Sequence, residues 1–161
     1  MSPSSAPTFS YVTSGGARGV IGRGDTLPEA FAQVALGVFA LVADPASVEE
    51  QDAREVRAHG NAPEALLVNW LNECLYVLDL EGFVARRVEF GNFSLDPAAP
   101  GGEPLRLHCR LLGEDFDPAR HVLRESVSGI LAEGAAVLAI ENGSEARVFV
   151  RSEGAMTASP K

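Results

Sequence analysis

Two amphipathic segments in the first half of the chain constrain the fold most strongly, because each combines a helix start signal with a continuous apolar face. In the first segment, Thr26 and Glu29 have the spacing of a capping box, and Pro28 falls in the first turn, where its missing backbone donor costs little. The apolar residues recur at helical spacing: Phe31, Val34, Ala35, Val38, Phe39 and Val42. The pattern predicts a helix over residues 27–42 that ends before Pro45.

The second segment repeats this arrangement at residues 61–64 (NAPE), where Asn61 is the expected N-cap. Its apolar face consists of Leu67, Trp70, Leu71, Cys74, Leu75 and Leu78. Gly82 suits the left-handed position that commonly follows a helix, so we predict that this helix ends within residues 79–82. Because Cys74 lies on the apolar face, we interpret it as a small core residue and not as a nucleophile.

The remainder of the chain carries strand patterns. Apolar and basic residues alternate along its clearest strand, as in a strand with one buried face. A turn segment separates the last two candidate strands and predicts a hairpin. The candidate strands are residues 18–23, 54–58, 83–90, 105–111, 135–140 and 146–150. Residues 97–104, rich in proline, glycine and alanine, predict an exposed loop.

These elements predict an α+β fold, a two-layer sandwich in which a mostly antiparallel sheet carries both helices on one face. The length suits one domain. We expect that domain to span residues 9–151, with a disordered leader over residues 1–8 and a flexible tail over residues 152–161.

The charge balance restricts the partners. The formal net charge is −9, whereas nucleic acids and anionic membrane surfaces attract clusters of basic residues. We therefore expect neither direct nucleic-acid binding nor membrane binding, and we expect the chain to act on another protein. Its two cysteines do not form a C-x-x-C pair or a disulfide framework, which favours a cytoplasmic location.

No recognised catalytic motif is present in the sequence. His59, His108 and His121 are scattered, and His108 alternates with two arginines as a surface residue of a strand would. The glycine-rich residues 14–19 lack the spacing of a phosphate-binding loop, so we interpret them as a flexible loop.

A cluster of carboxylates precedes Pro118 and consists of Glu114, Asp115 and Asp117. Such a cluster can bind a divalent cation, but the segment lacks the regular oxygen spacing of an EF-hand loop. We interpret it as a turn that Asp117 and Pro118 initiate.

Three segments, in this order along the chain, resemble the archease family. Residues 26–31 (TLPEAF) are similar to the T-L-x-E-A-F entry of the family's first helix. Residues 66–75 (LLVNWLNECL) are similar to the L-L-x-N-W-L-x-E-x-L pattern of its second helix. Residues 113–121 (GEDFDPARH) resemble the family's G-E-x-(Y/F)-D-P-x-R-H loop. The matches have family-like spacing, and the resemblance spans residues 9–151.

The resemblance implies both a fold and a function. Archeases are small, acidic, cytoplasmic α+β proteins that assist an RtcB-type RNA ligase, which joins RNA ends during tRNA splicing and repair. The family promotes formation of the ligase's guanylated intermediate and uses a bound divalent cation, calcium. Its cation-associated carboxylates lie in a D-H-T-A-D-V-G motif near the start and in an F-D-(V/I) motif near the end.

This sequence departs from the family at those two motifs. The first falls on residues 13–19 (TSGGARG), where Thr13 and Ala17 replace the aspartates. Arg151 stands in place of the terminal aspartate, and the family's K-A-x-T-Y-H stretch falls on residues 128–133 (SGILAE). Calcium needs about six to eight oxygen ligands, so we expect no calcium and no other cofactor. Either the Arg151 guanidinium fills the cation's place, or it points to solvent.

Two functions remain open. In the first, the chain is an archease-like accessory protein that docks on an RtcB-type RNA ligase, with Asp115, Asp117, Arg120 and His121 as the expected partner-binding residues. In the second, the archease scaffold is a repurposed binding or structural module with a different protein partner. The first gains if these four residues frame a surface, and the second gains if they only shape a turn. We predict no enzymatic activity, and the sequence leaves the oligomeric state open.

Overall fold

A computed structural model describes residues 8–14, 16–94, 105–122, 124–141 and 143–154. The elements in chain order are β1 (Thr8–Ser14), β2 (Ala17–Gly24), α1 (Leu27–Val42), a 3-10 turn (Pro45–Ser47), β3 (Asp52–Gly60), α2 (Pro63–Glu81), β4 (Phe83–Ser94), β5 (Leu105–Asp115), β6 (Glu125–Ile140) and β7 (Gly143–Gly154). Neither helix is long and apolar enough to cross a bilayer within the described part of the chain.

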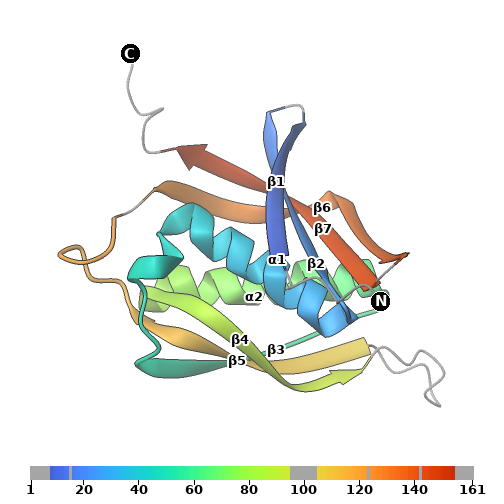
Figure 1. The fold of residues 1–161 in the computed structure, drawn as a ribbon, viewed down its shortest axis with the longest axis horizontal. Helices are drawn as coiled ribbons and strands as arrows, with labels where there is room; N and C mark the ends of the chain where they lie inside the picture. Colours follow the sequence, from blue (N-terminus) through green and yellow to red (C-terminus); the bar gives the residue numbers. More distant parts are fainter. Residues whose placement is uncertain (1–7, 15, 95–104, 123, 142, 155–161) are drawn as a thin grey trace, which may run out of the picture.

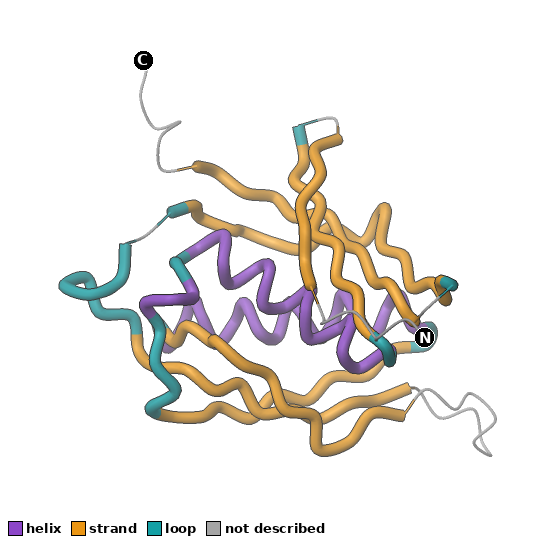
Figure 2. Tube along the Cα trace, in the orientation of Figure 1, coloured by secondary structure: helices purple, strands orange, loops and turns teal. Residues whose placement is uncertain are grey.

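The strands form two antiparallel sheets, and both helices lie between them (Figures 1 and 2). One sheet has the strand order β1-β2-β7-β6, and the other has the order β3-β5-β4. The predicted α+β class, with two helices and antiparallel pairing, is confirmed. The strands are divided between two sheets, so the helices are covered on both sides and the molecule has three layers where the sequence predicted two.

The apolar surface of α1 is wide enough to be covered by a sheet on each side, which accounts for the second sheet. Residues 37–42 of this helix are buried without interruption, and a helix covered from two sides needs an apolar surface wider than a single stripe. Gly22 of β2 lies so close to α1 that an added Cβ would be 2.4 Å from the carbonyl oxygen of Ala30. A side chain at this position would therefore push β2 away from the helix.

The ends of the helices test the predicted caps. The hydroxyl of Thr26 accepts a hydrogen bond from the Glu29 amide at 3.3 Å, and the Glu29 carboxylate accepts one from the Asp25 amide at 2.8 Å. The expected N-cap of α2 was wrong, because Ala62 occupies that position and makes no side-chain cap. Gly82 ends α2 in the left-handed conformation, with φ at 66°, as predicted.

The glycine-rich residues 14–19 do not form the flexible loop expected from the sequence. Instead they belong largely to a hairpin, in which β1 pairs with β2 and Gly16, with φ at 85°, lies in the reversal. β1 was not predicted, because serines and glycines flank its aromatic and β-branched residues. Thr8, placed in the leader, begins β1, and residues 152–154 of the expected tail belong to β7. The loop expected over residues 97–104 lies outside the described residues.

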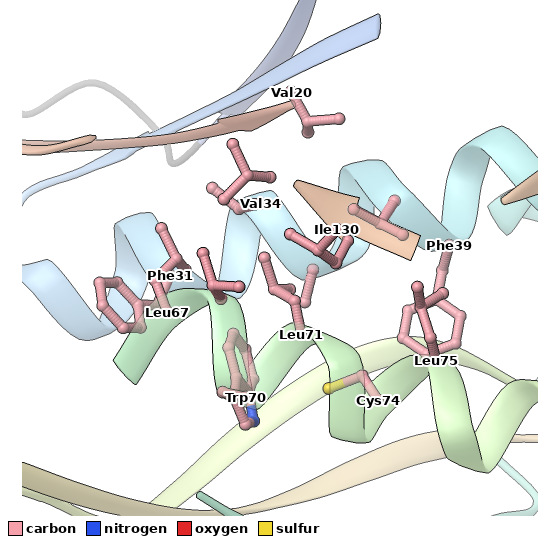
Figure 3. Packing of buried hydrophobic residues seen from close by; sticks show 14 of the residues in the cluster. Val20, Phe31, Val34, Phe39, Leu67, Trp70, Leu71, Cys74, Leu75 and Ile130 are labelled. Atoms are coloured by element: carbon pink, nitrogen blue, oxygen red, sulfur yellow. The ribbon is translucent and has the colours of Figure 1, made fainter. Parts of the chain in front are cut away.

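The core lies around the two helices (Figure 3). Trp70 of α2 is fully buried, and its ring centroid lies 6.1 Å from that of Phe31 and 5.3 Å from that of Phe90. The Trp70 indole donates a hydrogen bond to the Cys109 sulfur of β5 at 3.3 Å. Cys74 is also buried, as its place on the apolar face of α2 predicted. Trp70 therefore packs α2 against both α1 and the sheet β3-β5-β4.

Candidate functional site

The turn over residues 113–121 is organised around the carboxylate of Glu114, at the end of β5. The Glu114 side chain is only 7% exposed, and its oxygens accept hydrogen bonds from the Glu49 amide at 2.8 Å and from the Arg120 guanidinium. The His121 imidazole, whose side chain is fully buried, lies 2.9 Å from the same carboxylate. One buried carboxylate therefore joins the strand end, the turn and the segment before β3.

The hydrogen bonds of His121 define its tautomer. Its Nδ1 accepts a hydrogen bond from the Asp117 amide at 2.8 Å, so this nitrogen carries no proton. Nε2 consequently carries the hydrogen and donates it to Glu114. The Asp117 side chain accepts a hydrogen bond from the Ala119 amide at 2.9 Å, which closes the turn locally. The turn predicted from Asp117 and Pro118 is confirmed.

Glu114 stays ionised despite its burial. Burial acts to raise the pKa of its carboxyl, but the hydrogen bonds from Arg120, the Glu49 amide and His121 outweigh this effect and lower the pKa to about 2. The negative charge is thus a fixed part of the folded turn. In the sequence Glu114 is one of three acidic residues of a predicted turn, and its central position is visible only in the structure. Its spacing from the arginine and histidine that follow Pro118 was the sequence signal that could have identified Glu114 as their shared partner.

Three of the four predicted partner-binding residues reach the surface. The Asp115 side chain is 74% exposed and lies 3.5 Å from Arg54 of β3, and the side chains of Asp117 and Arg120 are partly exposed. The His121 side chain is buried, so it positions the turn and offers no surface of its own. Partner binding by this turn stays a prediction.

The turn is fixed against the end of α2. The Phe116 amide donates a hydrogen bond to the Gly82 carbonyl at 2.6 Å, directly after α2. Beside it lies a cavity of about 280 Å³. The described residues that line the cavity are Val42, Leu78, Asp79, Gly82, Phe116, Glu125, Ser126 and Val127. The surface around the turn therefore combines charged side chains with a partly apolar hollow.

The three substituted positions of the family's cation motifs meet at one end of the sheet β1-β2-β7-β6. Thr13 of β1 pairs with Arg18 of β2, and Arg18 pairs with Val150, the neighbour of Arg151 in β7. Ala17 precedes Arg18 and begins β2. Arg151 is exposed, and its guanidinium forms no hydrogen bond or ion pair with the residues that the structure describes. This geometry favours the solvent-facing alternative for Arg151.

Two arginines at this end of the sheet are paired with carboxylates. Arg18 forms an ion pair with Glu125 at 3.0 Å, and Arg124 lies 3.5 Å from Asp44. Tyr11 donates a hydrogen bond to the Gly37 carbonyl at 2.7 Å, and burial raises the pKa of Tyr11 to about 12 against the opposing effect of the arginines.

These residues do not fit a calcium ion. Of the three substituted positions, only Thr13 offers a side-chain oxygen, whereas calcium takes about six to eight oxygen ligands. Within the described ranges, no three His, Cys, Asp or Glu side chains come together as a metal site.

Comparisons with known proteins connect this geometry to a family. Residues 10–150 match the model of the archease protein family. The archease of Pyrococcus abyssi is 36% identical over 112 residues, which cover 70% of this chain and 75% of that protein. An archease-like protein of Drosophila melanogaster is 27% identical over 130 residues, which cover 80% of this chain and 79% of that protein.

The solution structure of a Methanobacterium thermoautotrophicum protein has the same fold. It superposes with a TM-score of 0.65 at 24% identity and covers 88% of this chain and 96% of its own. The family match extends over both helices, both sheets and the turn around Glu114. The chain belongs to the archease family.

Proposed function

We propose that this chain is an accessory protein that docks on an RtcB-type RNA ligase and assists it in tRNA splicing or RNA repair, with no catalytic chemistry of its own. Family membership supports this proposal. The single observation that carries it is the ordered turn over residues 113–121. Buried Glu114 holds this turn in place, and charged side chains of the turn are exposed on its surface. This turn belongs to one of the segments that resemble the family's pattern.

The hydrogen bonds around Glu114 give the turn a defined shape before any partner arrives. Binding costs less when a surface is already ordered, because fewer side chains lose conformational freedom on association. Asp115 and Arg120 present opposite charges on this surface, which suits a polar partner surface and fixes its orientation.

A ligation assay tests the proposal directly. The RNA ligase of the same organism is combined with the wild-type chain, with Asp115→Arg or with Glu133→Arg, and multiple-turnover ligation is measured. We expect wild-type stimulation, at least a tenfold loss for Asp115→Arg, and a change below about twofold for Glu133→Arg, since close charge pairs across an interface are worth about 1.5 kcal/mol or more. Glu133 is an exposed residue of β6 away from the turn, so its reversal makes the same change in net charge.

Co-purification provides the second readout of this experiment. If the ligase neither associates with the wild-type chain nor responds to it, the docking proposal is wrong. Equal losses for the two reversals would mean that overall charge, and not the turn, governs the effect.

The substitutions at the cation motifs favour the second candidate function. A repurposed binding or structural module of the archease scaffold, with a different protein partner, has no need for the aspartates that Thr13, Ala17 and Arg151 replace. Such a module leaves multiple-turnover ligation unchanged even at saturating concentrations. The same assay therefore separates the two functions.

We further propose that the chain binds no calcium at the family's cation position. In a calorimetric titration, the wild-type chain gives no saturable heat with Ca²⁺ up to about 1 mM, the weak end of protein calcium sites. The matched comparison is the triple variant Thr13→Asp, Ala17→Asp and Arg151→Asp, which restores carboxylates at the three positions. Stoichiometric uptake by the wild-type chain with a Kd below about 10 µM would contradict the proposal.

A further inference from the structure

A cavity of about 500 Å³ opens on the outer face of the sheet β3-β5-β4. Along β5, the residues on either side of each exposed basic residue are buried, so the basic side chains all point outward. The described residues that line the cavity are Arg57, Ala58, His59, Asn92, Arg106, Leu107 and His108. Its side chains thus supply two guanidiniums, two imidazoles and one amide.

The strand register brings these side chains together. Arg57 of β3 lies opposite His108 of β5, and His59 lies opposite Arg106. Asn92 of β4 pairs with His108 from the other side. Gly91 leaves room for this imidazole, because a Cβ at residue 91 would lie 3.1 Å from the His108 Nδ1. Residues directly opposite each other in antiparallel strands have Cβ atoms about 4.5–5.5 Å apart, so these side chains can reach one small ligand.

The described lining of the cavity carries basic side chains. None of the described lining residues is acidic, although the chain carries a formal net charge of −9. The neighbouring carboxylate of Glu55 lies 2.9 Å from the His108 Nε2, and Arg57 forms no ion pair with any described residue. The described lining thus offers several hydrogen-bond donors and no carboxylate, a combination that suits an anion.

We propose that this cavity binds a phosphate group, carried either by a small nucleotide or by an RNA strand. The planar guanidinium donates two parallel hydrogen bonds to a phosphate, and the amide of Asn92 and the imidazole of His59 add further donors. The volume falls within the roughly 300–1,000 Å³ of small-ligand sites. The described lining offers no aromatic ring other than imidazole, so phosphate contacts dominate over stacking of a base.

This site is distinct from the proposed ligase-docking turn. The cavity lies near the Leu105 end of β5, whereas the turn begins near its Asp115 end. It also qualifies the expectation from net charge that the chain does not touch nucleic acid. Net charge governs long-range attraction, but a local cluster of arginines can hold one phosphate in a chain that is acidic as a whole.

Calorimetric titration with pyrophosphate tests the inference on the full chain at about 0.1 M salt. The test variant is Arg57→Gln, and the control variant is Arg110→Gln, which removes the same charge from the same sheet face outside the cavity lining. We expect saturable binding to the wild-type chain, at least a tenfold weaker Kd for Arg57→Gln, and a change below about threefold for the control. Thermal unfolding of both variants checks that they remain folded.

Further titrations distinguish the source of the phosphate. A 5′-monophosphate nucleotide and an RNA decamer are compared with a hexaglutamate peptide, which offers carboxylates in place of phosphates. Arg57-dependent binding of the nucleotide, of the decamer or of both supports the inference and identifies the carrier. Absence of saturable binding to every phosphate probe, equal weakening in both arginine variants, or equally tight Arg57-dependent binding of the peptide overturns it. None of these results depends on the ligase.

Discussion

Replacement of Trp70 by alanine is expected to lower the free energy of unfolding by about 3–5 kcal/mol. The side chain is fully buried between the aromatic rings of Phe31 and Phe90, and its indole donates a hydrogen bond to the Cys109 sulfur. Alanine would leave a large cavity at the point where both helices meet the sheet β3-β5-β4. The surrounding backbone is held by two sheets and cannot collapse to fill it.

Urea denaturation followed by far-UV circular dichroism measures this effect without relying on tryptophan fluorescence. Tyr76→Ala is the matched control, because Tyr76 is an aromatic residue of the same helix that is 60% exposed. We expect the control to change stability by less than about 1 kcal/mol. A similarly small change for Trp70→Ala would mean that the core is not organised around this side chain.

Replacement of Glu114 by alanine is the second large effect that we expect, a loss of about 3 kcal/mol. The variant leaves the buried His121 without an acceptor, deprives Arg120 of its partner and leaves the Glu49 amide unpaired. Asp115→Ala serves as the control, since its exposed ion pair with Arg54 is worth at most about 1 kcal/mol. Equal losses in the two variants would contradict a central role for Glu114.

The stabilisation by Glu114 is expected to decrease as the pH falls. The pKa of its carboxyl is about 2 in the folded chain and 4.5 without the fold. The contribution is therefore complete above pH 4.5 and is lost as the pH falls through the folded value. The difference in unfolding free energy between wild type and Glu114→Gln is expected to be constant above about pH 5 and to shrink from there towards pH 2. A difference that does not change over this range would show that the charge of Glu114 is not what stabilises the turn.

The helices could be predicted from the sequence because their signals are local. Thr26, Glu29 and the apolar periodicity lie within a few turns of one another, and α1 begins and ends where they indicated. The cap of α2 could not be inferred in the same way. Asn61 is a good cap residue, but Pro63 begins the helix, so Ala62 occupies the cap position.

The division into two sheets could not be predicted because strand pairing is non-local. Alternation along a segment such as residues 105–111 shows that one face is buried, but not which strands lie beside it. The pairing of β2 with β7 joins residues more than a hundred positions apart. The uninterrupted apolar run over residues 37–42 was the available hint that α1 is covered from both sides.

The candidate site could be predicted in part. The family pattern located the turn over residues 113–121 and the substitutions at Thr13, Ala17 and Arg151. The sequence alone could not show that His121 points inward while Asp115 points outward. Only the burial of each side chain in the structure distinguishes a residue that shapes the turn from one that can contact a partner.

The burial of both cysteines determines when their thiols can react. Burial raises the pKa of the Cys109 thiol to about 11, and it raises the pKa of Cys74 as well. Oxidants and alkylating reagents attack the thiolate, and neither sulfur is accessible in the folded chain. Thiol damage must therefore wait for the core to open, which makes oxidation a measure of unfolding and not of the redox potential outside. The rate at which the two thiols react under native conditions is therefore expected to report how often the core opens.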